Sequence, residues 1–217
     1  MRYARRVPRT LKKSGAYHHG DLRRALLEAA VRVVEKDGVA ALSLQALARR
    51  AGVSSGAPYH HFESREQLLA EIAAEGFERL AAEMRSAAES APGDARAQLE
   101  ALGCGYVRFA LAHRGHFRIM FRPELKEQLG QARREEILES FAMLERAVAR
   151  CQREGAAPAG DPRPLVLLAW SAVHGASALW IDGSLQDQAL VADAHALEAM
   201  VSGTLGTLFA RAAPPPR

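Results

Sequence analysis

Cysteine and aromatic residues are scarce in this sequence. Two cysteines among 217 residues, Cys104 and Cys151, exclude a disulfide framework and a four-thiolate zinc site. We expect both to be buried, reduced thiols of a cytoplasmic protein. Aromatic residues make up 6% of the chain, whereas alanine contributes 43 residues. Because alanine favours helices and is depleted in strands, this composition disfavours an all-β fold and favours an all-α one.

Long hydrophobic runs are also nearly absent. The basic N-terminus is not followed by an apolar segment, so no secretory signal is predicted. Residues 164–181 contain no charged residue and could suggest a membrane span, but Ser171, His174 and Ser177 interrupt them. We therefore expect a buried core helix there and no membrane contact.

Charge is distributed unevenly along the chain. The net charge is +4, yet residues 1–65 hold 13 basic and 5 acidic residues, whereas residues 66–217 hold 16 basic and 20 acidic ones. A net charge of +8 on the first part and −4 on the rest predicts that only the first part binds a polyanion.

The spacing of apolar residues and helix caps divides the chain into four parts. About nine helices are expected in all, with no internal repeat. Residues 1–16 form a basic arm that either contacts DNA or is a solvated tail, and residues 17–64 form a three-helix domain. Residues 65–211 form a second helical domain, which begins with a connecting helix over 65–90. Residues 212–217 form a disordered tail.

Residues 43–54, SLQALARRAGVS, fit a helix-turn-helix. Ser43 can cap the first helix, Ala48 allows close contact between the helices, and Gly52 supplies the turn. A second helix from Ser54 to about residue 61 would enter the major groove of DNA, with Pro58 tolerated in its first turn. Such a pattern alone can also be a structural helix pair, but the positive charge favours DNA binding.

The region from residue 17 to residue 69 resembles the DNA-binding domain of TetR/AcrR-type transcriptional regulators. The resemblance rests on the AGVS turn at 51–54, the YHHF segment at 59–62 and the SREQLL segment at 64–69. Residues 170–175, WSAVHG, resemble the C-terminal domain of the subgroup named for Trp, His and Gly.

This resemblance implies a homodimer whose recognition helices enter successive major grooves of a nearly palindromic operator. This chain has small side chains at Ser55 and Pro58, where many relatives carry longer ones. Recognition of the operator sequence would therefore depend more on DNA shape. The implied DNA contacts are Ser43 and Gln45 to phosphates, Ser54, Ser55, Gly56, Ala57 and Pro58 to bases, and Tyr59, His60 and Arg65 to the backbone.

The resemblance also implies that the last two helices form a dimer interface and that the C-terminal domain binds a small effector. An ordinary core hairpin and plain core packing are the alternatives for these two groups of residues. The candidate interface residues are Ala172, Ala176, Ala199, Gly203 and Gly206; the candidate effector residues are Phe109, His113, Phe117, Met120, Phe121, Phe141, Trp170 and His174.

No cofactor, metal site or catalytic residue is predicted. His60 and His61 are adjacent and face different ways on a helix, and a zinc site at His113, His116 and His174 would need more ligands. No phosphate loop, nucleophile elbow or paired carboxylates support an enzyme, so a histidine-based hydrolase is disfavoured. A helical protein-interaction module without specific DNA binding is the other alternative. The resemblance thus implies a regulator that represses transcription and is released by a small-molecule effector.

Overall fold

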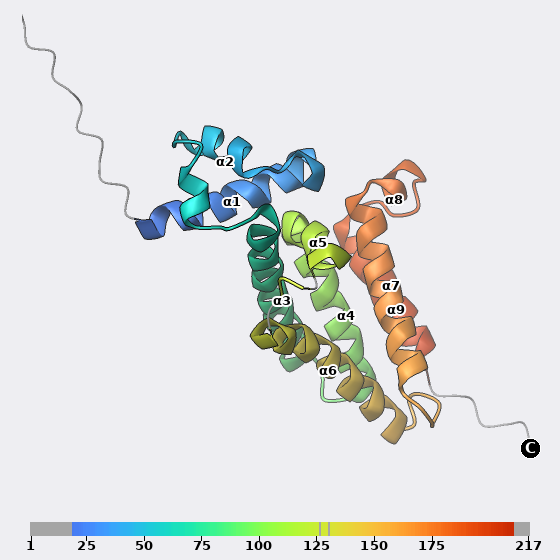
Figure 1. The fold of residues 1–217 in the computed structure, drawn as a ribbon. Coiled ribbons are helices and arrows are strands. Elements are labelled where there is room, and N and C mark those ends of the chain that lie inside the picture. The colour runs from blue at the N-terminus through green and yellow to red at the C-terminus, as the bar shows by residue number, and fades with distance from the viewer. Residues whose placement is uncertain (1–18, 126, 130, 211–217) are drawn as a thin grey trace, which may run out of the picture.

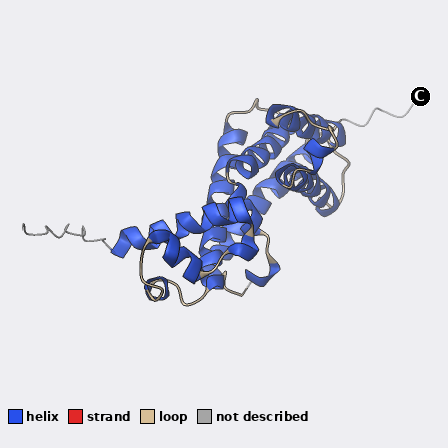
Figure 2. Cartoon of the chain, turned by 90° about the horizontal axis from the view of Figure 1, so that it is seen from above, coloured by secondary structure: helices blue, strands red, loops and turns tan. Residues whose placement is uncertain are grey.

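The structure, a computed structural model, describes residues 19–125, 127–129 and 131–210; the predicted arm and tail lie outside these residues. Over the described part the chain is helical, without strands, which confirms the all-α prediction (Figure 2). The α-helices are α1 (His19–Asp37), α2 (Leu44–Ala51), α3 (Arg65–Glu89), α4 (Ala95–Ala112), α5 (Arg114–Met120), α6 (Gln131–Arg153), α7 (Arg163–Ile181), α8 (Ser184–Asp187) and α9 (Ala194–Leu208).

The first helices pack around their own apolar core, which includes Leu26, Leu47 and Phe62. Ser43 caps α2 as predicted, because its Oγ accepts a hydrogen bond from the N–H of Ala46 at 3.1 Å. Gly52 ends α2 in the left-handed conformation, with φ of 68°. The helix-turn-helix pattern therefore sets the limits of α2 as the sequence predicts.

The segment after this turn differs from the prediction. Instead of a helix from Ser54, it forms a single 3-10 turn, η2 (Ala57–His60), preceded by Gly56, which has no side chain that could cap it. Pro58 lacks an N–H, and the N–H groups of Tyr59 and His61 bond three residues back, to Gly56 and Pro58. The segment that the sequence predicts as the DNA-recognition helix is therefore a short, tight turn.

Helix α3 begins with a side-chain cap at Ser64. The Ser64 Oγ accepts from the N–H of Gln67 at 3.0 Å, and the Gln67 side chain accepts from the N–H of Glu63 at 2.6 Å. From this start α3 runs through both cores, with Leu68 in the first and Phe77 in the second. It is thus a rigid connection between the two parts of the molecule (Figure 1).

The second core surrounds α4, which contacts α3, α6, α7 and α9. Its apolar residues include Leu102, Tyr106 and Phe109 on α4. The helices α7 and α9 lie side by side on the flank of the molecule away from α3, and α6 crosses near the end opposite α2 (Figure 1).

Helix α5 joins the two cores. A Cβ on Gly115 would lie 2.7 Å from the carbonyl oxygen of Val31, so α5 approaches α1 too closely for any side chain there. Arg118 on α5 donates to the carbonyl oxygen of Glu35 at 3.0 Å and to that of Ile181 at 3.2 Å. One guanidinium thus connects the ends of α1 and α7.

Helix α7 is not the fully buried core helix that the sequence predicts. It is long and apolar enough to cross a membrane by length and composition, and only 33% of its apolar 18-residue stretch is buried. One face packs inward through Val166, Val173 and Ser177, whereas Leu167 and Leu179 are exposed. A helix with apolar residues on both faces requires a second surface to cover the outer one.

Candidate DNA-binding surface and effector cavity

The outer face of α2 presents polar and basic side chains. Leu44, Leu47 and Ala48 face the core, which leaves Gln45 and Arg49 exposed one turn apart. Arg50 is paired with Asp37 at 3.0 Å, whereas Arg49 has no partner among the described residues. Arg49 was not among the predicted contacts, although its place in the last turn of a basic helix could have indicated it.

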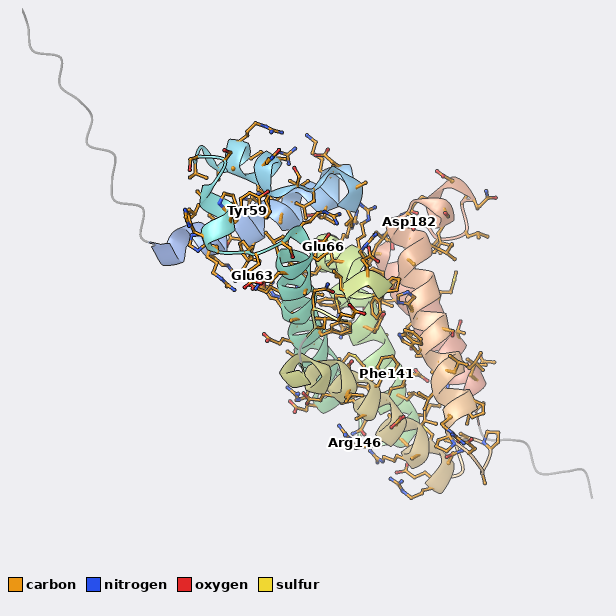
Figure 3. All side chains as sticks on the ribbon, viewed as in Figure 1. Tyr59, Glu63, Glu66, Phe141, Arg146 and Asp182 are labelled. Atoms are coloured by element: carbon orange, nitrogen blue, oxygen red, sulfur yellow. The ribbon has the colours of Figure 1, made fainter. Side chains whose placement is uncertain are left out.

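Most of the predicted DNA-contact residues are exposed. Tyr59 is 53% exposed and stands on the first domain, distant from Phe141 and Arg146 on α6 (Figure 3). Pro58 is buried, so its predicted base contact conflicts with its packing, and Ala57 is half-buried. The exposed members are Ser43, Gln45, Ser54, Ser55, Gly56, Tyr59 and His60.

Arg65 lies differently from a free phosphate ligand. Its Nε donates to the carbonyl oxygen of Leu42 at 2.9 Å and its Nη2 to that of Val39 at 2.8 Å. Its Nη1 lies 3.3 Å from the Glu66 carboxylate. The guanidinium thus bonds to the segment between α1 and α2. This contact forms only in the folded domain and does not follow from spacing in the sequence.

The second core contains an apolar cavity of about 30 Å³ between α3, α4, α6 and α7. Three of the predicted effector residues line it: Phe121, Phe141 and Trp170. Phe117 and His174 line a neighbouring surface hollow together with Phe121. Phe109, His113 and Met120 line neither; Phe109 and Met120 are packed in the core. The predicted set therefore falls into three groups.

Tyr106, which the sequence analysis missed, is the polar group of this region. Its hydroxyl lies 2.8 Å from Nδ1 of His174. Burial raises the pKa of the Tyr106 phenol and lowers the pKa of the His174 imidazole, which favours a neutral hydroxyl donating to a neutral ring. The ring of His174 also lies 5.5 Å from that of Trp170 one turn away, so the two form one aromatic face. A tyrosine within an apolar helix gave no signal of this contact.

The remaining histidines do not form a metal centre within the described part of the chain, where no group of three His, Cys, Asp or Glu side chains could hold an ion. His113 and His116 are adjacent, with ring centroids 5.8 Å apart, but His174 belongs to the aromatic cluster instead. Of the cysteines, Cys151 is buried as expected, whereas Cys104 is half-buried; both are free thiols.

The predicted interface residues do not all face outward. Ala199 and Gly203 are exposed on α9, and Ala176 packs against the core. Gly206 is buried against α4, where a Cβ would lie 2.7 Å from the Glu100 carboxylate. The outer face of α7 and α9 is apolar instead through larger residues, with Leu168 46% and Met200 50% exposed.

Comparison with known proteins agrees with this arrangement. Residues 26–72 match the family of bacterial regulatory proteins, tetR family, and residues 99–204 match the tetracyclin repressor-like C-terminal domain. The HTH-type transcriptional regulator BetI of Rhizobium meliloti (strain 1021) is 47% identical over 47 residues, 22% of this chain and 23% of BetI. The similarity to that curated relative therefore spans less than a quarter of its length.

Solved structures extend the likeness to the whole fold. A protein with unknown function from Rhodococcus sp. RHA1 is 38% identical, with a TM-score of 0.72, over 91% of this chain and 100% of that one. The TetR family transcriptional regulator PfmR from Thermus thermophilus shares the fold, with a TM-score of 0.68 at 21% identity over 85% of this chain and 96% of that one. The chain belongs to the TetR family of DNA-binding transcriptional regulators.

Proposed function

We propose that this chain is a cytoplasmic repressor that binds a palindromic operator as a homodimer and is released by a small-molecule effector. The observation that carries the proposal is the exposed polar surface of α2 and η2 at the end of the molecule opposite α6 (Figure 3). In this proposal the DNA-binding domain ends at residue 64 and the effector-binding and dimerisation domain begins at residue 65. No catalytic role is proposed for either domain.

The apolar outer face of α7 and α9 supports the dimer. Leu168, Leu179 and Met200 are about half exposed, and a Cβ on Gly203 would meet nothing within 4 Å. Exposed apolar side chains beside small residues allow two copies to approach closely. A two-fold protein places its two reading turns on half-sites one DNA turn apart.

The cavity and the Trp170–His174 face support effector binding and a place in the Trp-His-Gly subgroup. Both residues lie on the inward half of α7, and α7 ends at Ile181, whose carbonyl accepts from Arg118. The same guanidinium bonds to Glu35 at the end of α1. A ligand that shifts α7 would thus act on the first domain, and a coupling of about 1–3 kcal/mol changes DNA affinity 5–150-fold.

A gel-shift titration with DNA from upstream of its own coding region tests the DNA-binding role. We expect saturable binding much tighter than to random DNA at physiological salt, and footprinting should protect a palindrome. Gln45→Ala and Tyr59→Ala should weaken binding, because both side chains are exposed on the reading surface.

The matched control is Arg163→Ala, an exposed side chain at the start of α7. It should leave DNA affinity unchanged. Equal affinity for upstream and random DNA, or equal losses with the control, would favour the protein-interaction alternative.

A further inference from the structure

The surface hollow lined by Phe117, Phe121 and His174 is large enough for a small molecule. It lies between α5, the 3-10 turn η3 (Pro123–Leu125) and the end of α7, and its volume is about 490 Å³. The apolar cavity beside it holds about 30 Å³, room for about one water molecule. Of these two neighbouring spaces, the hollow is therefore the one that an effector can enter.

One wall of the hollow is aromatic. The ring centroid of His174 lies 5.2 Å from that of Phe117 and 4.6 Å from that of Phe121, which it meets edge to face. Ala178 and Ile181 of α7 also line the hollow and add apolar surface. Aromatic rings stabilise one another in stacked and edge-to-face arrangements beyond the area they bury. A ligand with a planar ring would therefore suit this wall.

His174 also offers a hydrogen-bond donor. The Tyr106 hydroxyl donates to its Nδ1, and a neutral imidazole carries one N–H, so the proton lies on Nε2. Nε2 has no hydrogen-bond partner among the described residues. The tyrosine thus fixes the tautomer that presents a free donor, and a ligand that meets it needs an acceptor atom.

The two arginines of the hollow differ in their partners. Arg118 already donates to the backbone carbonyls of Glu35 and Ile181. Arg122 is paired with Glu124, two residues further along the chain, and Glu124 is exposed. Exposed ion pairs of this kind are weak, so a ligand can replace Glu124 as the partner of Arg122.

The distribution of charge favours a ligand with one negative charge. The acidic side chains of the hollow, Glu124 and Asp182, are exposed, whereas its donors His174, Arg118 and Arg122 are half-buried. The deeper polar groups therefore require an acceptor. Two carboxylates at the rim would repel a dianion such as a phosphate monoester more strongly than a monoanion.

We propose that the effector is a small aromatic carboxylate that binds in this hollow. Its ring would pack on Phe117 and Phe121, and its carboxylate would accept hydrogen bonds from Arg122 and from Nε2 of His174. The inference rests on the proposed effector function and names its ligand class.

The position of the hollow gives such a ligand a direct route to the first domain. Arg118 and Ile181 both line the hollow, and the guanidinium that bonds Ile181 also bonds Glu35 at the end of α1. A ligand between α5 and α7 would displace this contact without touching the DNA-binding surface. Asp182, at this end of α7, lies far from Phe141 and Arg146 on α6 (Figure 3).

Three ligands that share a naphthalene ring and differ in charge test the ligand class. The full chain is titrated by calorimetry at neutral pH with 2-naphthoate, 2-naphthalenemethanol and 2-naphthylmethylamine, and with acetate. We expect 2-naphthoate to bind at least about tenfold tighter than the alcohol, because a charged hydrogen bond replaces a neutral one. The amine should bind more weakly still, and acetate, which has no ring, should give no measurable binding.

Substitutions at the paired residues Arg122 and Glu124 test the site in opposite directions. Arg122→Gln should remove the preference for 2-naphthoate and leave binding of the alcohol as it was. Glu124→Gln should tighten 2-naphthoate binding a few-fold, because it frees Arg122 and removes a negative charge from the rim. The control Arg114→Gln, an exposed arginine of α5 outside the hollow, should keep the preference.

The double variant Tyr106→Phe, His174→Phe tests the second donor. It removes both partners of one hydrogen bond and keeps both rings, so the fold should be retained, which circular dichroism checks. Binding of 2-naphthoate should weaken a few-fold more than that of the alcohol. Equal binding of acid and alcohol by the unchanged protein, tighter binding of the amine, or equal losses in Arg122→Gln and Arg114→Gln would overturn the inference.

A gel shift with operator DNA separates this inference from the proposed function. If 2-naphthoate binds with the expected response to Arg122→Gln but DNA affinity does not change, the ligand class stands and the effector role fails. If DNA binds specifically and 2-naphthoate does not bind, the regulator stands and the ligand class fails.

Discussion

The guanidinium of Arg65 donates from Nη2 to the carbonyl oxygen of Val39 at 2.8 Å, across the start of α3 and the segment between α1 and α2. Its Nε makes a second bond, to Leu42. Both acceptors precede Ser43, the cap of α2, so Arg65 fixes the position of the helix that presents Gln45. If an Arg65 variant binds DNA poorly, the first cause is therefore the displaced α2, and a lost phosphate contact comes second.

Arg65→Ala should lower the free energy of unfolding by about 2 kcal/mol, because two carbonyl groups lose charged donors. Arg65→Lys should recover only part of this, since an ammonium cannot bond both carbonyls as a fork does. Urea unfolding followed by circular dichroism measures the loss. Arg32→Ala, an exposed arginine on α1, is the control and should change stability by less than about 0.5 kcal/mol. If stability is unchanged and the slope of log DNA affinity against log salt concentration becomes shallower by about 0.9, Arg65 instead contacts a phosphate.

Local signals in the sequence were sufficient for both limits of α2 and for the start of α3. Ser43, Gly52 and Ser64 act on backbone groups within a few residues, so their roles follow from spacing alone. The 3-10 turn at Ala57–His60 did not follow, although Pro58 was visible, because helix patterning does not distinguish one short turn from another.

Contacts between distant segments were not predictable. Tyr106 meets His174 and Arg118 meets Glu35 through packing of separate helices, and neither pair has a sequence motif. Gly206 illustrates the same limit: a small residue on an apolar helix suits an outer or an inner interface equally, and here it is the inner one.

Leu168→Glu combined with Met200→Glu should convert the proposed dimer to a monomer. Both side chains lie on the outer face of α7 and α9, and a two-fold interface would bring each carboxylate against the same surface of its mate. Sedimentation analysis measures the mass, and operator affinity should fall with it. Leu190→Glu, a 63% exposed residue in the loop after α8, is the control and should stay dimeric. A double variant that remains a dimer would place the interface elsewhere.

Arg118→Gln should weaken communication between the domains while each still binds its own ligand. The substitution removes the guanidinium that bonds both Glu35 and Ile181. Coupling residues of this kind contribute about 0.5–2 kcal/mol, so the effect of the effector on operator affinity should shrink a few-fold. Gel shifts with and without an effector found by a thermal-shift screen measure it. Arg114→Gln, on the same helix, serves as the control; an identical response in both variants would exclude Arg118 from the coupling.

His116 should make the protein less stable in mild acid. It is buried on α5, its ring nitrogens have no hydrogen-bond partner among the described residues, and the Glu75 carboxylate lies 3.8 Å away. Burial, together with the nearby Arg79 and His113, lowers the His116 pKa to about 4 against the attraction of Glu75. The unfolded chain, with an ordinary histidine pKa near 6.5, then binds more protons than the folded one between about pH 6.5 and 4.

Stability should consequently fall as the pH decreases through this window, by up to about 1.4 kcal/mol per pH unit from His116. His113 and His174, whose pKa values burial also lowers, would add to the slope. Urea unfolding at several pH values measures it. His116→Leu should flatten the slope and lose no stability at neutral pH, because it removes two unpaired buried nitrogens. His60→Gln, at an exposed position in η2, should keep the slope; a His116→Leu slope equal to that of the unchanged protein would assign the acid sensitivity to other groups.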